Sequence, residues 1–370
     1  VASSNTMQTS SRNNRFNLLR LVAALAVFVA HGVFLYRLHL PVPFVGHSLG
    51  SLAVYVFFFI SGFVICQSWA RQPDWRAFWV KRVMRIFPGL VVAVAFSVCI
   101  VGWSVTTLPS VDYWKAFGTW VNFANNAVGL ATVQTLPGVF ESNPFARAVN
   151  GSLWTIRYEL AMYLVLAALA WHARGRRWVY PVAVFVLSVL WVVARVKGWD
   201  ASIERAGGPV ADVFRWRDFC GFGVPFFMGS TLAAYSVRPR AWMGWAAGLA
   251  TVYAYFSPNV LGVQGAVWGL VVFGTFYVAH AGNPQRQSQD QAPLDISYGV
   301  YIYAFPVQQA VTELCLRHGW PLAACMLLSL VCILLLAVLS WYCVERPCIR
   351  AAHRYATERR RLRSTLVASS

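Results

Sequence analysis

Residues 20–31, RLVAALAVFVAH, place an arginine and a histidine at the two ends of an otherwise apolar stretch. In a helix turning ~100° per residue, Arg20 and His31 fall on nearly the same face, roughly 16 Å apart along the axis. Ionisable side chains inside a membrane helix are costly and usually mark a functional path. The stretch therefore predicts a membrane-spanning helix with two functional side chains on one face.

The overall composition is that of a membrane protein. Of 370 residues, 58% are hydrophobic and only 12% are charged, and the mean hydropathy is +0.54. A soluble protein of this size would carry more charge on its surface. Repeated apolar runs predict an all-α polytopic transmembrane bundle of about ten spans. They lie near residues 17–36, 50–68, 84–103, 152–172, 179–196, 218–236, 241–257, 263–281, 296–316 and 321–343.

The net charge of +18 fits a membrane surface better than a nucleic acid. With the N-terminus inside, most of the 31 Lys and Arg residues fall in cytoplasmic segments, as the positive-inside rule requires. No basic patch is interleaved with a motif that reads nucleic acid. We therefore predict an N-in, C-in topology, contact with membrane lipids and no nucleic-acid partner.

The segments outside the spans are interpreted by composition. We predict that residues 1–16 form a disordered cytoplasmic tail. We predict that residues 347–370 form a basic cytoplasmic tail that lies on anionic lipid. The outer connection 104–151 has many turn-forming residues, and its length indicates a functional lid or a disordered loop. A second outer loop, 197–217, suits either an anionic acceptor or plain solvation, because it carries Arg205, Arg215 and Arg217.

The eight cysteines fall mostly inside or beside apolar spans. No Cys/His spacing resembles that of a zinc site. We expect small buried hydrophobes, with neither a disulfide framework nor a bound metal.

Three cationic positions and one histidine allow two interpretations each. His31 is a general base as a neutral imidazole, or an interhelical hydrogen-bond partner. Arg20 is functional, or its charge snorkels to the interface.

Arg82 and Arg85 share a helix face at the predicted opening of the third span, where Pro88 would kink or re-set the helix. Their guanidiniums suit phosphate, or are ordinary positive-inside charge.

Polar residues also gather in the fourth and ninth spans. Glu159 lies on one helical face with three hydroxyl-bearing residues, so we expect it to face a polar cavity or to pair with a cation. That face comprises Ser152, Thr155, Glu159 and Tyr163. In the ninth span, Tyr298 and Tyr301 give a hydroxyl-bearing inner end, which is either part of a site or an interfacial aromatic belt.

Six motifs occur here in an order that resembles the acyltransferase-3 family of integral membrane acyltransferases. They are the Arg20–His31 pair, FFFISGFVI (57–65), the RxxR of Arg82 and Arg85, Ser-Leu-x5-Glu (152–159), ISYGVYIY (296–303) and VERP (344–347). The resemblance covers about residues 17–350. It implies a membrane acyltransferase domain at 17–346, in a bacterial inner membrane, that moves an acetyl or other short acyl group from cytoplasmic acyl-CoA to a glycan hydroxyl.

The resemblance also assigns roles to residues. His31 matches the family's essential histidine, Arg20 its partner arginine, and Glu159 the acidic position of span four. Arg82 and Arg85 match the pair proposed to meet the donor. Where many members have a Trp-His-x-Pro sequence in span nine, this chain has Tyr-Ala-Phe-Pro (303–306), which leaves His31 as the main candidate for the base.

These roles predict a mechanism. Acetyl-CoA enters from the inside onto Arg82 and Arg85, beside Tyr298 and Tyr301, and His31 deprotonates a hydroxyl of an exopolysaccharide or lipopolysaccharide acceptor. Glu159 orients His31 or neutralises Arg20. The alternative function is a proton-coupled transporter or flippase of a glycan or lipid that uses the same buried charges as a relay. The sequence carries no indication of oligomeric state.

Overall fold

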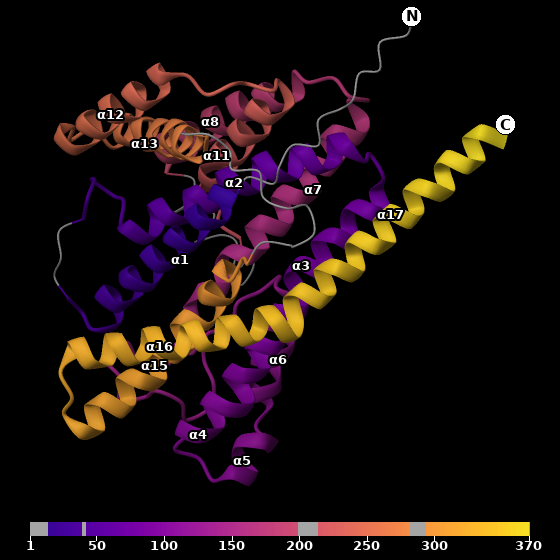
Figure 1. The fold of residues 1–370 in the computed structure, drawn as a ribbon. Helices are drawn as coiled ribbons and strands as arrows, with labels where there is room; N and C mark the ends of the chain where they lie inside the picture. The colour runs from indigo at the N-terminus through magenta and orange to yellow at the C-terminus, as the bar shows by residue number, and fades with distance from the viewer. Residues whose placement is uncertain (1–13, 39–41, 199–213, 281–293, 370) are drawn as a thin grey trace, which may run out of the picture.

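The computed structural model describes residues 14–38, 42–198, 214–280 and 294–369, and side chains between residues 15 and 362. Every regular element in these ranges is helical, since the one β pairing is an isolated bridge between Phe44 and His47. The elements are α1 (Asn14–Leu35), α2 (Leu49–Arg71), α3 (Trp75–Ala95), η1 (Phe96–Gly102), α4 (Trp103–Val105), α5 (Ser110–Lys115), α6 (Phe117–Val128), η2 (Gly151–Thr155), α7 (Ile156–His172), α8 (Val179–Lys197), α11 (Trp216–Ala234), α12 (Ala241–Phe256), α13 (Val260–Gly269), η3 (Leu270–Gly274), α14 (Thr275–His280), α15 (Ser297–His318), α16 (Leu322–Ser340), η4 (Trp341–Glu345) and α17 (Arg346–Ser369). Figure 1 shows their arrangement.

The helices confirm the predicted all-α membrane bundle. A helix occupies each of the predicted spans, because a chain in lipid must satisfy its backbone hydrogen bonds within each segment. Among the described residues, 7 helical segments are long and apolar enough to cross a membrane. They are Arg15–Leu35, Leu49–Arg71, Trp75–Val105, Gly151–His172, Val179–Lys197, Val260–His280 and Leu322–Leu362. The count of about ten spans and the N-in, C-in orientation stay predictions.

The ninth predicted span is an interior helix rather than a lipid-facing one. α15 packs against α1 and α16 and also touches α3 and η2. Its polar residues Gln308, Gln309 and Thr312 are fully buried. Protein surrounds these side chains, so α15 needs less hydrophobicity than a helix exposed to lipid.

α2 and α11 form the closest helix pair near the centre of the bundle. A Cβ added to Gly62 would overlap the backbone carbonyl of Phe226, and Ser230 Oγ donates a hydrogen bond to the Gly62 carbonyl at 3.1 Å. Small residues let two membrane helices approach until their backbones touch. The glycine of the FISGFVI stretch therefore holds α2 against α11.

The third helix begins earlier than the sequence predicts. Helical structure runs without a break from Trp75 to Val105, through Pro88. Its start is capped by Asp74, whose side chain accepts a hydrogen bond from the Ala77 amide at 2.7 Å. The predicted start at residue 84 is wrong, because this cap and the apolar residues that follow it fix the helix start two turns before Arg82.

The last helix is also longer than predicted. α16, η4 and α17 follow one another without a break, with a bend at the π-helical segment η4 (Figure 1). α17 returns alongside α3, where Arg359 lies 3.0 Å from Asp74 and Gln72 Nε2 donates to the Ala356 carbonyl at 2.8 Å. The described part of the predicted basic tail, residues 347–369, is thus a helix that packs on α3, where the sequence predicted only a surface tail.

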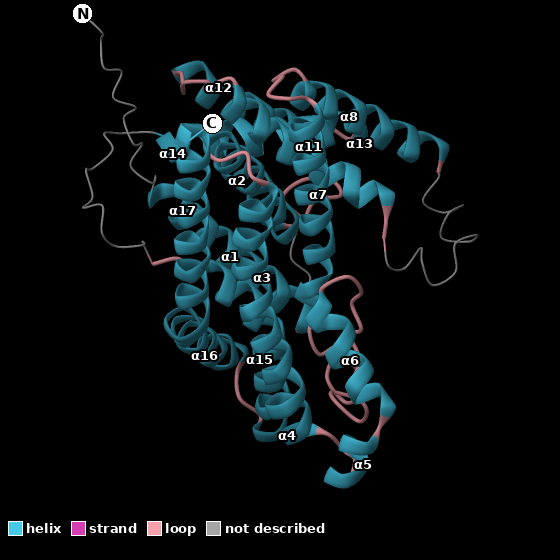
Figure 2. Ribbon diagram, turned by 90° about the vertical axis from the view of Figure 1, so that its right-hand side faces the viewer, coloured by secondary structure: helices cyan, strands magenta, loops and turns pink. Residues whose placement is uncertain are grey.

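The long connection 104–151 is ordered and packed against the protein. It contains α5 and α6 and lies at the end of the molecule opposite the C-terminus (Figure 2). Asn150 Nδ2 donates to the Ile302 carbonyl at 3.0 Å, and Asn143 Nδ2 donates to the Gln309 carbonyl at 3.0 Å. The disordered-loop interpretation is therefore wrong, and the segment braces the outer half of α15.

The expectation that the cysteines form no disulfide is wrong at one position. Cys315 and Cys325 are disulfide-bonded, with Cα atoms 6.2 Å apart. The turn at Gly319 folds α16 back against α15, which brings the two thiols together. The predicted 1–16 tail lies almost wholly outside the described residues, as does Arg205.

Candidate active site

An inner pocket lies between α1, α2, α3, α7 and α15. It has a free volume of about 100 Å³, which makes it a narrow slot. All the predicted site residues except His31 line it: Arg20, Arg82, Arg85, Glu159, Tyr298 and Tyr301. The structure therefore gathers residues that are up to 281 positions apart in the sequence numbering. We call the end of the bundle near Arg20 the inner end and that near His31 the outer end.

Two of the arginines share a carboxylate that the sequence analysis did not assign. Arg85 Nη2 lies 2.7 Å from Asp295 Oδ2, and Arg20 Nη1 lies 3.6 Å from the same oxygen. Ser297 Oγ donates to the other oxygen of Asp295 at 2.5 Å. Asp295 thus joins α1 to α3 at the start of α15.

Arg85 also contacts a second buried acid. Its Nη1 lies 3.6 Å from Oε2 of Glu345, whose side chain is fully buried. Ser340 Oγ donates to Glu345 Oε1 at 3.0 Å. The guanidinium of Arg85 is therefore held between two carboxylates from α15 and η4, and a π-helical segment positions one of them, as often occurs at functional sites.

The ionisation of Asp295 follows from this arrangement. Burial by itself raises the pKa of a carboxyl group, but the Arg85 and Arg20 guanidiniums and the Ser297 hydrogen bonds lower the pKa of Asp295 below its ordinary value. Opposite charges within ~4–6 Å favour the ionised form. Asp295 is accordingly a carboxylate at neutral pH.

Arg82 differs from its neighbours on the pocket wall. No carboxylate lies within ion-pair distance of it among the described residues, and its Nε atom is buried with no hydrogen-bond partner. Its guanidinium lies 5.9 Å from the centre of the Tyr163 ring. Arg85 is therefore ion-paired with two protein carboxylates, whereas Arg82 lines the pocket with no carboxylate within ion-pair distance among the described residues. That the two arginines meet the donor's phosphates stays a prediction.

Glu159 is hydrogen-bonded to hydroxyl groups, and within the part of the chain that the structure describes it forms no ion pair. It accepts hydrogen bonds from Ser61 Oγ at 3.4 Å and from the Tyr163 hydroxyl. The carboxylate next to Arg20 is Asp295. The prediction that Glu159 faces a polar cavity agrees with the structure. No hydrogen bond or ion pair joins Glu159 to Arg20 or His31 among the described residues, and its predicted role of orienting His31 or neutralising Arg20 stays a prediction.

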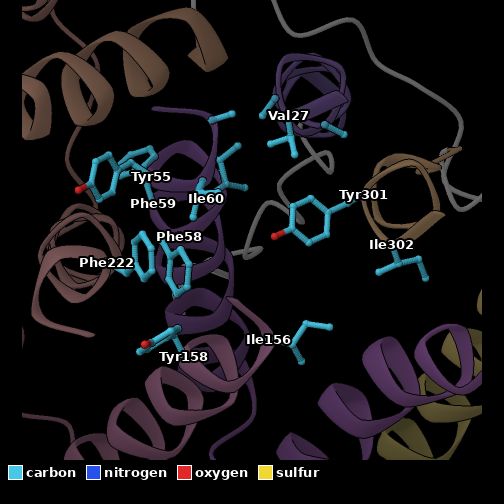
Figure 3. Close-up of a cluster of buried hydrophobic side chains, with 14 of the residues drawn as sticks. Val27, Tyr55, Phe58, Phe59, Ile60, Ile156, Tyr158, Phe222, Tyr301 and Ile302 are labelled. Atoms are coloured by element: carbon cyan, nitrogen blue, oxygen red, sulfur yellow. The ribbon is translucent and has the colours of Figure 1, made fainter. Parts of the chain in front are cut away.

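The two tyrosines of α15 are fixed by hydrogen bonds. The Tyr298 hydroxyl donates to the Ile86 carbonyl at 2.9 Å. The Tyr301 hydroxyl donates to the Ser152 carbonyl at 2.8 Å and lies 2.7 Å from Thr155 Oγ1. Figure 3 shows Tyr301 extending from α15 into the space beside α2 and α7. Tyr301 is buried, Tyr298 is half-buried, and both line the inner pocket, which fits part of a site better than an interfacial belt.

His31 lies outside the inner pocket and lines a second, outer cavity of about 1410 Å³. Its Nδ1 atom is buried with no hydrogen-bond partner, and its ring meets Phe305 edge-on at 5.1 Å. Val54 and Tyr301 line both cavities. The outer cavity with its imidazole therefore adjoins the inner pocket with its arginines at these two residues.

Three functional candidates escaped the sequence analysis. Asp295 and Glu345 were visible as acids beside apolar spans, one directly before the ISYGVYIY motif and the other within VERP, but their partners lie on α1 and α3. Gln308 is fully buried, and its Nε2 donates to the Phe28 carbonyl at 3.1 Å, one turn before His31. For Gln308, the sequence signal was an amide side chain within an apolar helix, because a buried amide needs hydrogen-bond partners.

Comparison with known proteins decides the class. The family model described as an acyltransferase domain, Acyl_transf_3, matches residues 13–345. The chain belongs to this family. The acyltransferase is accordingly a membrane enzyme, and the transporter or flippase alternative loses its support.

Relatives over nearly the full length carry related names. An "O-acetyl transferase" of Shigella phage Sf6 is 31% identical over 345 residues, covering 90% of this chain and 96% of the phage protein. "Nodulation protein 10" of Rhizobium leguminosarum bv. viciae is 27% identical over 378 residues, covering 92% and 95%. "Acyltransferase MdmB" of Streptomyces mycarofaciens is 30% identical over 208 residues, about half of each chain (51% and 48%). No solved structure matches the acyltransferase.

Proposed function

We propose that the acyltransferase moves an acetyl or other short acyl group from cytoplasmic acyl-CoA to a hydroxyl of an extracytoplasmic or lipid-linked glycan. The observation that carries the proposal is the pair of adjoining cavities. One is lined by Arg20, Arg82 and Arg85, and the other by His31. A donor and an acceptor that approach from opposite ends would meet at Val54 and Tyr301.

The inner pocket supports a phosphorylated donor. Arg82 has no protein counter-ion within ion-pair distance, so an anionic group entering the pocket would supply one. Guanidinium groups bind phosphate strongly through paired donors. The slot of about 100 Å³ suits a thin thioester arm better than a sugar. The ADP portion of the donor would remain at the inner mouth.

The outer cavity supports the acceptor and the base. His31 lines this cavity, and its Nδ1 has no hydrogen-bond partner among the described residues, so we assign the imidazole the role of base. It would remove the proton of the acceptor hydroxyl as the oxygen attacks the thioester carbonyl carbon. The carbon–sulfur bond then breaks, and the CoA thiolate leaves and takes up a proton. General-base assistance typically contributes ~10²–10⁴-fold.

The test compares O-acetyl content of surface and secreted glycans in strains with matched membrane abundance of the protein. One strain lacks the gene, and the others carry the wild-type chain, His31→Ala, or the control Arg238→Gln. Arg238 is exposed at the end of α11 remote from His31. We expect acetyl to be missing in the deletion and His31→Ala strains, with the glycan still exported. Unchanged acetylation in the deletion strain would overturn the proposal.

A further inference from the structure

The outer cavity gathers cationic side chains from three distant parts of the chain. Arg37 follows α1, Arg195 is near the end of α8, and Arg217 is in the first turn of α11. Asp218 is the one carboxylate in the described lining, and its Oδ1 lies 3.9 Å from Arg217 Nε. His47, also in the lining, is buried, and burial lowers its pKa below the ordinary value, so it is neutral at pH 7. The cavity wall thus carries an excess of positive charge.

These arginines run against the charge bias of the rest of the chain. They lie at the same end as His31. In the predicted topology this is the extracytoplasmic end, where the positive-inside rule disfavours Lys and Arg. Arg37 and Arg195 are largely exposed, and the side chain of Arg217 is 38% exposed. Arg217 lies beside Asp218, whereas neither Arg37 nor Arg195 forms an ion pair with another described residue. Cationic side chains that line one cavity raise the local concentration of anionic ligands, so the cluster favours an anion in the outer cavity.

The same cavity presents rigid aromatic surfaces. Trp154, Trp191, Tyr55 and Phe222 are part of its lining. Trp191 packs edge-on against Trp268 at 5.4 Å, and Phe222 lies at 5.7 Å from the ring of Tyr55 and at 5.7 Å from that of Trp154. Rings held this way lose little entropy when an amphipathic ring packs on them. The pyranose ring of a sugar is amphipathic in this sense.

We propose that the outer cavity binds an anionic saccharide, that is, a sugar with a carboxylate or phosphate near the hydroxyl to be acylated. The arginines hold the anionic group, the aromatic rings pack against the sugar, and His31 faces the acceptor hydroxyl. This inference rests on the proposed function and specifies its acceptor. The cavity of about 1410 Å³ accommodates more than one sugar unit.

Binding is measurable without acyl transfer because Trp154 and Trp191 line the cavity. The full chain in nanodiscs of zwitterionic lipid is titrated with digalacturonate, with its neutral counterpart galactobiose, and with galactose 1-phosphate, while tryptophan fluorescence is followed. We expect at least one anionic probe to bind at least tenfold more tightly than galactobiose. Arg217→Gln and the double variant Arg37→Gln/Arg195→Gln should weaken that binding at least tenfold, and Arg238→Gln should not.

The outcomes separate the source of the charge. Preference for digalacturonate assigns the anion to a uronate of the glycan, and preference for galactose 1-phosphate assigns it to a phosphate linkage. Equal binding of galactobiose, no binding of any probe, or arginine variants that match Arg238→Gln would overturn the inference. His31→Ala should retain anion binding and lose acyl transfer, so retained transfer in that variant refutes the proposed reaction and not the binding site.

Discussion

Oδ2 of Asp295 lies 2.7 Å from Nη2 of Arg85 and thereby ties the start of α15 to the middle of α3. The same oxygen lies 3.6 Å from Arg20, and Glu345 approaches Arg85 from η4. The inner pocket is therefore built on an ion cluster whose members come from α1, α3, η4 and the segment just before α15. Its energetics are open to direct measurement.

Replacing Asp295 tests the centre of this cluster. Asp295→Asn keeps the size of the side chain but leaves Arg20 without its carboxylate and Arg85 with Glu345 alone. Removing one partner of a buried pair is strongly destabilising, here by about 3 kcal/mol. We expect the melting temperature in detergent to fall by several degrees. Asp295→Glu should restore part of the loss, and a variant as stable as wild type would contradict the role assigned to the cluster.

The same group gives a pH dependence with a defined sign. The pKa of Asp295 is lowered in the folded protein from the ordinary value of 3.8. Its contribution to stability is therefore complete above that value and is lost as the pH falls through the folded pKa. We expect the melting-temperature gap between wild type and Asp295→Asn to narrow as the pH falls below about 4. A gap that grows on acidification would contradict this.

The two arginines of the RxxR motif should behave differently when replaced. Arg82→Gln removes a cation that has no protein carboxylate, so we expect a near-normal melting temperature and a donor KM raised about tenfold or more, as for loss of a charged hydrogen bond. Arg85→Gln leaves the Asp295 and Glu345 carboxylates without their shared cation, so its main effect should be a lower melting temperature. Thermal unfolding and steady-state kinetics on both variants check this. Identical profiles for the two would argue against the asymmetry.

Because α2 and α11 touch at Gly62, one methyl group added at this position should lower the stability of the protein. In Gly62→Ala, the new Cβ overlaps the Phe226 carbonyl, so the helices must separate at a cost of about 1–3 kcal/mol. Gly248→Ala in α12 is the matched control, because nothing lies within 4 Å of its Cβ position. Thermal unfolding of the two variants should show a loss only for Gly62→Ala.

The Cys315–Cys325 disulfide predicts both a stability effect and an orientation. The bond closes a loop with a sequence separation of 10, so the Cys315→Ser/Cys325→Ser variant should lose about 2–3 kcal/mol by chain entropy. Disulfides persist on the oxidising side of a membrane, which is the outer end in the predicted topology. An impermeant maleimide applied to intact cells should label these thiols only after reduction. Labelling without a reductant would contradict the bond.

Much of the helical architecture was predictable because lipid imposes a local rule. Any apolar stretch of about twenty residues must form a helix there, and helices occupy all the predicted spans. Helix ends were less accessible. The Asp74 cap and the α3–α17 contact extend two helices beyond the apolar runs, because packing between protein surfaces stabilises polar turns that lipid would not.

The sequence by itself determined the class of the protein, its helices and the set of residues around the pocket. Arg20, His31, Arg82, Arg85 and Glu159 stood out because charge within an apolar run is visible in one dimension. Only the tertiary structure decided their partners: Asp295 between two arginines, Glu159 with hydroxyls, and His31 in a separate cavity. The spacing of residues along a helix defines which side chains share a face, but not which other helix packs against that face. Electrostatic pairing acts over a few ångströms between neighbouring helices, and no local sequence pattern encodes which helices are neighbours.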